Sequence, residues 1–300
     1  MYTLLINAVG DPDKADRLIK EMRKTTKHLP VETIVAGEDV KHLGSVYSTR
    51  SFAIRTIECE AVPAAWMKLF SEATTEYLVC LDSRIRLVNS GLITDPNQTR
   101  DKAIRNTFKR FAGSKHPAKH NYSLGPYKQT IEYLIHLLKN SPALLIFPCL
   151  LIEELANIVF YHGLGFANRI PTPKNVKSIY HQIRTDPNLR WRREFAGCLT
   201  AFAVKASAIK QAESCFDEPY LFGLDLQLQI RDTGGLIYST TDVAVWLSGK
   251  IPTPDSDLIV ASRQKSFDGA FLRRWKESEL FDIESLHPPD YPAIQKISSR

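Results

Sequence analysis

Residues 76–84 read Glu76-Tyr77-Leu78-Val79-Cys80-Leu81-Asp82-Ser83-Arg84 and predict a buried strand that ends in a carboxylate. The run from Tyr77 to Leu81 is apolar without interruption, which is typical of a parallel strand covered by helices on both faces. Asp82 follows the strand directly and is therefore expected at the edge of the sheet. A carboxylate held there can bind a metal ion or the hydroxyl groups of a ribose.

The eighty residues around and before this strand alternate strands with helices. Strands are expected at residues 3–6, 31–36 and 54–59, with helices that begin at Pro12 and Pro63. This alternation predicts an α/β fold with an open parallel sheet, whose ligands bind beyond the carboxyl ends of the strands. Asn7, Asp39 and Asp82 stand at such ends. We expect these three side chains to converge on one edge.

The rest of the chain is expected to complete this domain and to extend it. We assign residues 1–95 to a ligand-binding half and residues 96–190 to a helical, basic insertion. Residues 191–250 supply the second half of the domain, and residues 251–300 form a C-terminal extension with one helix. The predicted architecture is an open mixed sheet flanked by helices, with a helical insertion and a helical extension.

Composition places the chain among globular proteins and locates its charge. The 300 residues are 44% hydrophobic and carry a formal charge of +6, which excludes a fibre or a disordered tail. Residues 100–128 hold eight basic residues against Asp101 alone, with aromatic residues interleaved. This pattern favours an anionic partner, namely a nucleic acid, a phospholipid-linked molecule or an acidic glycan. A solvated helix face is the alternative. The expected contacts are Arg105, Lys109, Arg110 and Lys115.

Several features favour the cytoplasm. The five cysteines are dispersed without a Cys-x-x-Cys pair, as expected of reduced thiols. No basic and apolar leader opens the chain, so no secretory signal is predicted. The most apolar stretch, Ala143–Ile152, is shorter than the roughly 20 residues that a membrane span needs. We therefore expect a soluble cytoplasmic protein with, at most, a peripheral contact at a membrane.

A second informative segment lies between residues 215 and 235. It reads Phe216-Asp217-Glu218-Pro219-Tyr220-Leu221-Phe222-Gly223-Leu224-Asp225 and continues to Gly234-Gly235. Asp225 is expected at the N-terminal end of a short helix that runs to Arg231, where the helix dipole favours an anion. The alternative is that Asp225 caps this helix and has no further role.

In this order and at this separation, the two segments resemble the GT-A glycosyltransferases of the inverting family-2 type. In that family a strand followed by Asp-x-Asp closes the nucleotide-binding half. A Phe-Asp-Glu turn and a Glu-Asp pair that opens a helix come later. The resemblance covers about residues 2–90 and 195–250 and is most specific from Phe216 to Gly235. Ala196–Thr200 also matches, and Arg273-Arg274-Trp275 weakly resembles a basic-Trp pair of some members.

The resemblance implies a nucleotide-sugar co-substrate whose sugar is transferred to an acceptor hydroxyl with inversion. Asp225 matches the general base. Asp82 matches the first Asp of Asp-x-Asp, which contacts the donor ribose or a divalent metal. Asp39 matches loosely and is equally expected as a turn residue. The implied donor-binding residues are Asp39, Asp82, Ser83 and Arg84. The implied acceptor or pocket residues are Gly197, Leu224 and Trp246.

Three positions depart from the family pattern: Arg84 replaces the second Asp, Leu224 replaces the Glu of Glu-Asp, and Leu247 or Ser248 replaces a His. A guanidinium binds phosphate oxygens and is permanently charged. We therefore hypothesise that Arg84 takes over part of the metal's role, which leaves the Mn²⁺ or Mg²⁺ site at Asp82 weak or absent. The alternative places Arg84 in solvent beside Arg86.

Other catalytic classes are disfavoured. The sequence has no Gly-x-x-x-x-Gly-Lys phosphate loop, no Gly-x-Gly-x-x-Gly after the first strand and no Gly-x-Ser-x-Gly elbow. His116 and His120 have metal-like spacing, but Pro117 disfavours one helical face. Two alternatives stay open. One is a viral-type glycosyltransferase that acts on a modified DNA base, and the other is an inactive GT-A domain that binds a nucleotide or scaffolds a partner.

Overall fold

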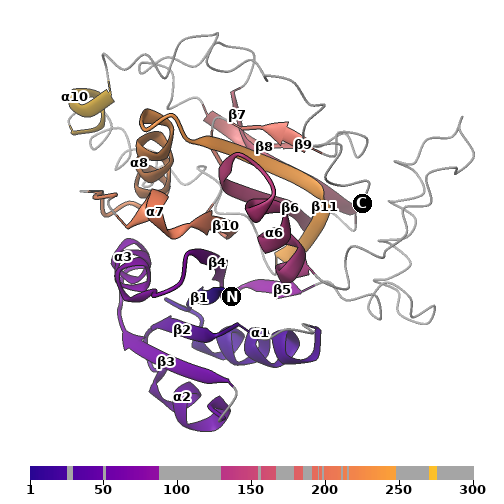
Figure 1. The fold of residues 1–300 in the computed structure, drawn as a ribbon, viewed down its shortest axis with the longest axis vertical. Helices are drawn as coiled ribbons and strands as arrows, with labels where there is room; N and C mark the ends of the chain where they lie inside the picture. Colours follow the sequence, from indigo (N-terminus) through magenta and orange to yellow (C-terminus); the bar gives the residue numbers. More distant parts are fainter. Residues whose placement is uncertain are drawn as a thin grey trace, which may run out of the picture.

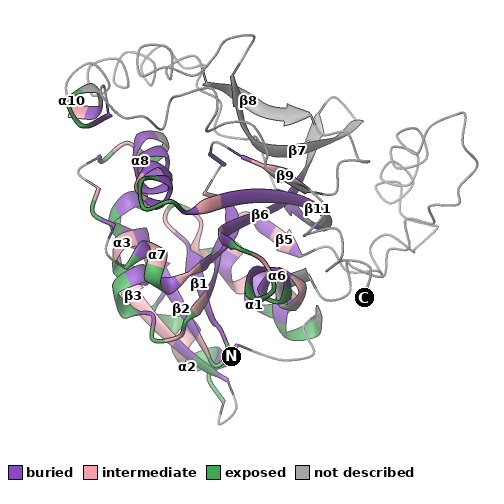
Figure 2. Cartoon of the chain, turned by 45° about the horizontal axis from the view of Figure 1, so that its top comes forward, coloured by how far each residue is buried: buried purple, intermediate pink, exposed green. Residues whose placement is uncertain are grey.

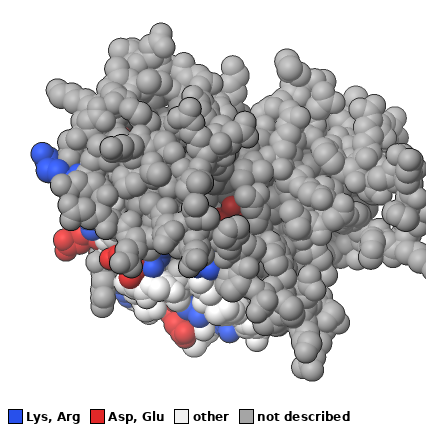
Figure 3. All heavy atoms as spheres, turned by 90° about the horizontal axis from the view of Figure 1, so that it is seen from above, with Lys and Arg blue, Asp and Glu red and all other residues white. Residues whose placement is uncertain are grey.

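The computed structural model describes residues 1–25, 30–49, 52–87, 130–154, 157–166, 179–184, 191–194, 196–197, 199–210, 212–214, 216–247 and 270–275. Its strands join in one sheet with helices on both faces (Figure 1). No helix among these residues is long and apolar enough to cross a membrane. Acidic and basic side chains are interspersed on the described part of the face in Figure 3. The predicted or considered residues Arg105, Lys109, Arg110, Lys115, His116, His120 and Ser248 lie outside the described ranges.

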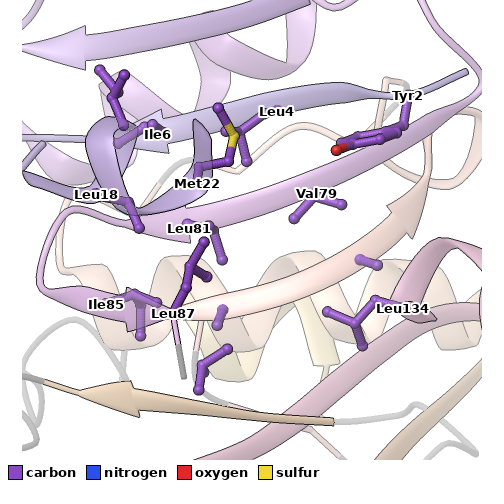
Figure 4. Close-up of a cluster of buried hydrophobic side chains, with 14 of the residues drawn as sticks. Tyr2, Leu4, Ile6, Leu18, Met22, Val79, Leu81, Ile85, Leu87 and Leu134 are labelled. Atoms are coloured by element: carbon purple, nitrogen blue, oxygen red, sulfur yellow. The ribbon is translucent and has the colours of Figure 1, made fainter. Parts of the chain in front are cut away.

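The N-terminal half forms the parallel sheet that the alternation predicts. β1 (Thr3–Asn7), β2 (Glu32–Gly37), β3 (Ala53–Glu58) and β4 (Tyr77–Asp82) lie in the order β3-β2-β1-β4. α1 (Pro12–Thr25), α2 (Lys41–Tyr47) and α3 (Val62–Glu72) make the crossovers. The apolar side chains of α1, Ala15, Leu18, Ile19 and Met22, are fully buried. Figure 4 shows Leu18 and Met22 beside Leu4 and Leu81.

The second half of the domain extends this sheet with strands of mixed direction. β10 (Ala201–Lys205) pairs antiparallel with β4, followed by β6 (Ala143–Glu154), β11 (Leu236–Leu247) and β5 (Ile85–Leu87). β7 (Asn157–Phe166), β8 (Ile179–Arg184) and β9 (Trp191–Arg193) pair beside this path. The helices are α6 (Thr130–Lys139), α7 (Ala206–Ile209), α8 (Pro219–Asp232) and α10 (Leu272–Trp275). The expected open mixed sheet is confirmed.

The helical character expected for the 96–190 region is wrong from residue 143 onward. Among its described residues, α6 is helical, whereas β6, β7 and β8 are strands. The apolar run Ala143–Ile152 lies in β6, between β10 and β11. The periodicity of such a run does not distinguish a buried strand from a buried helix. Pro148 has no N–H for the ladder, and the register between β6 and β11 shifts beside it.

Side chains of the central strands alternate between two buried layers. On β4, Leu81 belongs to the layer of α1 and α6, whereas Cys80 belongs to the layer of α3 and α8. Figure 2 shows the buried strands between these helices. Asn7 and Asp82 each stand one residue beyond a side chain of the α1 and α6 layer. They therefore fall on the side of α3 and α8.

Candidate functional site

The strand order reverses between β1 and β4, and ligands bind at such a point in open α/β sheets. β1 has β2 on one side and β4 on the other. Asn7 and Asp82, the last residues of β1 and β4, are register partners. Their predicted meeting at one edge of the sheet is confirmed. A ligand-binding crevice is therefore expected beyond these two residues.

Asn7 and Asp39 have structural partners at this edge. The Asn7 amide donates to the backbone oxygen of Val62 (3.0 Å), and its side-chain oxygen accepts from the backbone N–H of Val9 (3.2 Å). Asn7 thereby ties the loop after β1 to the start of α3. Asp39 is exposed in a left-handed conformation (φ 53°), and its backbone oxygen accepts from the His42 ring (2.8 Å). This geometry agrees with the interpretation of Asp39 as a turn residue. Its contact with the nucleotide-sugar donor stays a prediction.

Asp82 and Arg84 form a bidentate ion pair at the end of β4. The Arg84 Nε and Nη2 atoms lie 2.8 and 2.9 Å from the two carboxylate oxygens, and the Arg84 backbone N–H also donates to Asp82 (2.8 Å). The Asp82 and Arg84 side chains are 19% and 25% exposed, so a ligand can reach the pair. Arg86 instead binds Glu21 of α1 (3.0 Å). The two arginines therefore have separate partners, and the solvent alternative for Arg84 is wrong.

The side chains at this edge do not fit a divalent cation. A guanidinium occupies both oxygens of the Asp82 carboxylate, and a metal ion would have to displace it. Ser83 is buried, and its backbone N–H donates to the oxygen of Asn7 (2.8 Å). Within the described ranges, no group of three or more His, Cys, Asp or Glu could hold a metal ion. Arg84 carries a positive charge at this edge and is paired with Asp82, and its contact with a phosphate stays a prediction.

Asp225 lies in the middle of α8, so the prediction that it stands at the N-terminal end of a helix is wrong. The helix begins about two turns earlier, because Pro219 occupies its first turn and Glu218 caps it. The Glu218 carboxylate accepts from the backbone N–H of Leu221 (2.8 Å). The capping interpretation of Asp225 is excluded on the same ground.

The Asp225 carboxylate is completely buried and accepts hydrogen bonds from α8 and α10. Trp275 Nε1 donates to Oδ1 (2.8 Å), while Gln229 Nε2 (3.0 Å) and Arg274 Nη1 (3.2 Å) donate to Oδ2. Burial raises the pKa of Asp225, and the bond from Trp275 and the charge of Arg274 oppose this rise. The weakly matched Arg274-Trp275 pair thus contacts the very residue that the resemblance assigns as the base.

The small-residue segment 196–200 links α8 to the edge of β4. Gln227 of α8 bonds both the N–H and the C=O of Gly197, the latter at 2.8 Å. Gly197 has no room for a side chain, because a Cβ atom there would lie 2.5 Å from the Phe147 ring. At the other end of the segment, the oxygen of Thr200 accepts from the last backbone N–H of β4 (2.7 Å). The segment therefore couples the position of α8 to that of the ion pair.

Leu224 and Trp246 belong to the core. They are 1% and 5% exposed, so neither presents a surface to an acceptor in this arrangement. Gly197 is also buried and serves close packing. The acceptor roles of these three residues stay predictions.

A buried charged cluster beside α8 escaped sequence reasoning. The Glu194 carboxylate accepts from the Ser239 hydroxyl, and the Glu194 backbone oxygen accepts from Arg231 Nη1 (3.2 Å). Burial, together with the charge of Arg193, lowers the pKa of Arg231 to about 10. Glu194 follows two arginines in the sequence, a pattern typical of an exposed charged run. No signal in the sequence indicates that Glu194 is buried.

Comparison with known proteins bears on the fold. No protein-family model matches the sequence, and no curated protein matches it. The crystal structure of GalNAc-T7 with UDP, GalNAc and Mn²⁺ matches 100% of this chain at a TM-score of 0.55 and 11% sequence identity. GalNAc-T7 is a GT-A glycosyltransferase. The chain has the GT-A fold.

This GT-A chain spans about half, 54%, of the length of the GalNAc-T7 chain. The crystal structure of a mycobacterial protein is also similar, over 91% of this chain and 74% of that one, at 12% identity and a TM-score of 0.49. The GalNAc-T7 match alone carries the conclusion: it confirms the expected resemblance to GT-A enzymes at the level of the fold.

Proposed function

We propose that this protein is a glycosyltransferase that moves a sugar from a nucleotide-sugar donor to an acceptor hydroxyl with inversion. The observation that carries the proposal is the partly exposed Asp82–Arg84 pair at the strand-order reversal of a GT-A sheet. A ligand of this fold is expected at that edge. At that edge Asp82 can accept a hydrogen bond from a hydroxyl group, and Arg84 can donate hydrogen bonds to a phosphate.

At the donor end, Arg84 contacts the diphosphate and Asp82 accepts from a hydroxyl of the ribose. Guanidinium groups bind phosphate oxygens through several N–H donors in a fixed plane. The pair with Asp82 holds this plane in place before the donor arrives. In this proposal Arg84 supplies the positive charge that a divalent metal would otherwise bring to the diphosphate.

At the acceptor end, Asp225 is the general base. The acceptor oxygen attacks the anomeric carbon, the bond from that carbon to the phosphate oxygen breaks, and the nucleoside diphosphate leaves with the electron pair. Asp225 takes the proton of the acceptor hydroxyl, a transfer typically worth about 10²–10⁴ in rate. Asp225 has no exposed surface. The acceptor therefore meets it only after Arg274 and Trp275 have moved aside.

A second candidate function, nucleotide binding without turnover, is favoured by the enclosure of Asp225. A carboxylate that accepts from Trp275, Arg274 and Gln229 has the partners of a structural anchor. In that case α10 holds Asp225 permanently, and the domain presents a bound nucleotide without transferring its sugar.

One experiment separates the two functions. Release of nucleoside diphosphate from UDP-, GDP- and dTDP-sugars is measured for the wild type, Asp225→Asn and the control Asp217→Asn, whose carboxylate is exposed. The transferase proposal predicts release by the wild type and Asp217→Asn, and a rate about 10²–10⁴ lower for Asp225→Asn. Activity should survive EDTA.

Each contrary result removes a different part of the proposal. Equal rates for Asp225→Asn and the wild type would exclude Asp225 as the base. If the wild type binds a nucleotide sugar but releases no nucleoside diphosphate from it, the result would favour the binding function. Strict dependence on Mn²⁺ would contradict the role given to Arg84.

A further inference from the structure

Thr200 carries a buried hydroxyl that has no hydrogen-bond partner within the described residues. The residue is 3% exposed and immediately precedes β10. Almost all buried polar side chains in folded proteins have a partner, and each exception calls for an explanation. A hydroxyl that serves a ligand is one such explanation, so the surroundings of Thr200 decide what it can do.

Thr200 and Asp82 are cross-strand neighbours. Ala201 pairs with Leu81, and the ladder continues one step further because the Asp82 backbone N–H donates to the oxygen of Thr200 (2.7 Å). Opposed residues of an antiparallel pair project to the same face with Cβ atoms about 4.5–5.5 Å apart. Phe202, two residues on from Thr200, belongs to the layer of α3 and α8. The Thr200 hydroxyl therefore falls on the same side as the Asp82 carboxylate.

The chemistry of this position fits a sugar hydroxyl. Asp82 can accept a hydrogen bond, and the Thr200 hydroxyl can both donate and accept. A phosphate placed between these two groups would be repelled by the negative charge of the Asp82 carboxylate. A neutral hydroxyl can form hydrogen bonds with both groups. Asp82 is partly exposed, whereas Thr200 is 3% exposed, so a ligand seated on Asp82 can bond to the Thr200 hydroxyl only if the turn at 199–200 shifts.

We propose that Thr200 binds a hydroxyl of the donor, either on its ribose or on the sugar that is transferred. The proposal rests on the proposed function and adds a binding residue to its donor site. Arg84 then contacts the diphosphate, while Asp82 and Thr200 together hold the neighbouring hydroxyl.

Thr33 provides a matched control for the test. Its hydroxyl is likewise buried and without a partner in the described part of the chain. Thr33 is the second residue of β2 and lies at the amino end of the strand, opposite the candidate site. In both positions Val replaces the hydroxyl by a methyl group of similar size. Because neither hydroxyl has a partner among the residues that the structure describes, both variants should fold at least as stably as the wild type.

The test measures Kd by calorimetry for UDP, GDP, dTDP and their glucose conjugates. For the donor that the wild type binds, we expect about a tenfold weaker Kd in Thr200→Val, which corresponds to about 1.4 kcal/mol. Thr33→Val and Thr200→Ser, which keeps a hydroxyl at position 200, should stay within about twofold of the wild type, as they keep the donor's hydrogen bond. Weakening already seen with the free diphosphate assigns the contact to the ribose. Weakening seen only with the glucose conjugate assigns it to the transferred sugar.

Two failures are distinguishable. If the wild type binds a donor and Thr200→Val binds it equally well, the inference about Thr200 is overturned while the proposed function stands. If the wild type binds none of the six compounds, the proposed function is contradicted. The inference about Thr200, which rests on that function, is then overturned as well. Equal weakening in Thr33→Val and Thr200→Val would also overturn the inference, because it would make the effect one of the fold.

Discussion

Replacing Trp275 by Phe tests whether α10 holds the Asp225 carboxylate in its charged form. The substitution keeps an aromatic ring in a site that is 5% exposed, and removes the Nε1–H that donates to Oδ1 of Asp225 at 2.8 Å. Two losses are expected. The smaller ring packs less well at every pH, whereas the lost hydrogen bond matters chiefly when Asp225 is ionised.

The pH dependence separates these two losses. Burial raises the pKa of folded Asp225 above its unfolded value, so this group's contribution to stability is fully present below about pH 4. It is lost as the pH rises through the folded pKa, because the buried carboxyl must ionise. Without the Trp275 donor the folded pKa rises further, so the variant should lose more stability with rising pH than the wild type. A hydrogen bond to a charged group contributes about 1.5–3 kcal/mol. Because Arg274 and Gln229 remain, we expect an added loss of about 1.5 kcal/mol.

Urea unfolding between pH 4 and pH 8 measures this difference. The control is Arg273→Gln, which changes an exposed neighbour on the same helix and should leave the curve unchanged. In an Asp225→Asn background, Trp275→Phe should cost the same at every pH. A loss that is independent of pH in the wild-type background would refute the reasoning, since it would reduce the role of Trp275 to packing.

Three further predictions concern packing and charge. Gly197→Ala should destabilise the fold by about 2–3 kcal/mol in urea unfolding, because its Cβ would lie 2.5 Å from the Phe147 ring; full stability would show that the ring can move away. Gln227→Leu should cost about 3 kcal/mol in the same assay, because it leaves the backbone N–H and C=O of Gly197 without the bonds of the amide and removes one of the bonds to the Gly223 oxygen; a neutral result would mean that other groups replace the amide. Changing Arg105, Lys109, Arg110 and Lys115 together to Gln should weaken binding to duplex DNA and lower the slope of log K against log salt by about 3 to 4; an unchanged slope would place the anionic contact elsewhere.

The N-terminal half of the fold is readable from the sequence because its signals are local. Strands such as Tyr77–Asp82 are apolar runs bounded by polar residues, and α1 shows a helical stripe after Pro12. Periodicity and helix-start residues therefore suffice there. They also bring Asp82 to the sheet edge, since residues that follow parallel strands share that edge.

The rest required tertiary contacts that no local pattern carries. Ala143–Ile152 is apolar on every side, so its strand state depends on its pairing with β10 and β11. Asp225 is an exception, since a local signal places it in mid-helix: the cap residue Glu218 and Pro219 open that helix earlier. The contact of Trp275 with Asp225 joins residues 50 apart in the sequence. The Asp82–Arg84 pair spans only two residues, yet whether the guanidinium turns toward the carboxylate or toward solvent is not encoded in their spacing.

Variants of Arg84 show whether this guanidinium binds the diphosphate of the donor without a metal ion. Arg84 pairs with Asp82 at the proposed donor site, whereas Arg86 pairs with Glu21 on α1, so the two arginines form a matched pair. Kd for UDP, GDP and dTDP would be measured by calorimetry in EDTA for the wild type, Arg84→Gln and Arg86→Gln. We expect metal-independent binding of one diphosphate, with an affinity at least tenfold weaker in Arg84→Gln (about 1.4 kcal/mol) and unchanged in Arg86→Gln. Equal affinity in the wild type and Arg84→Gln, or binding that appears only when Mn²⁺ is added, would contradict this expectation.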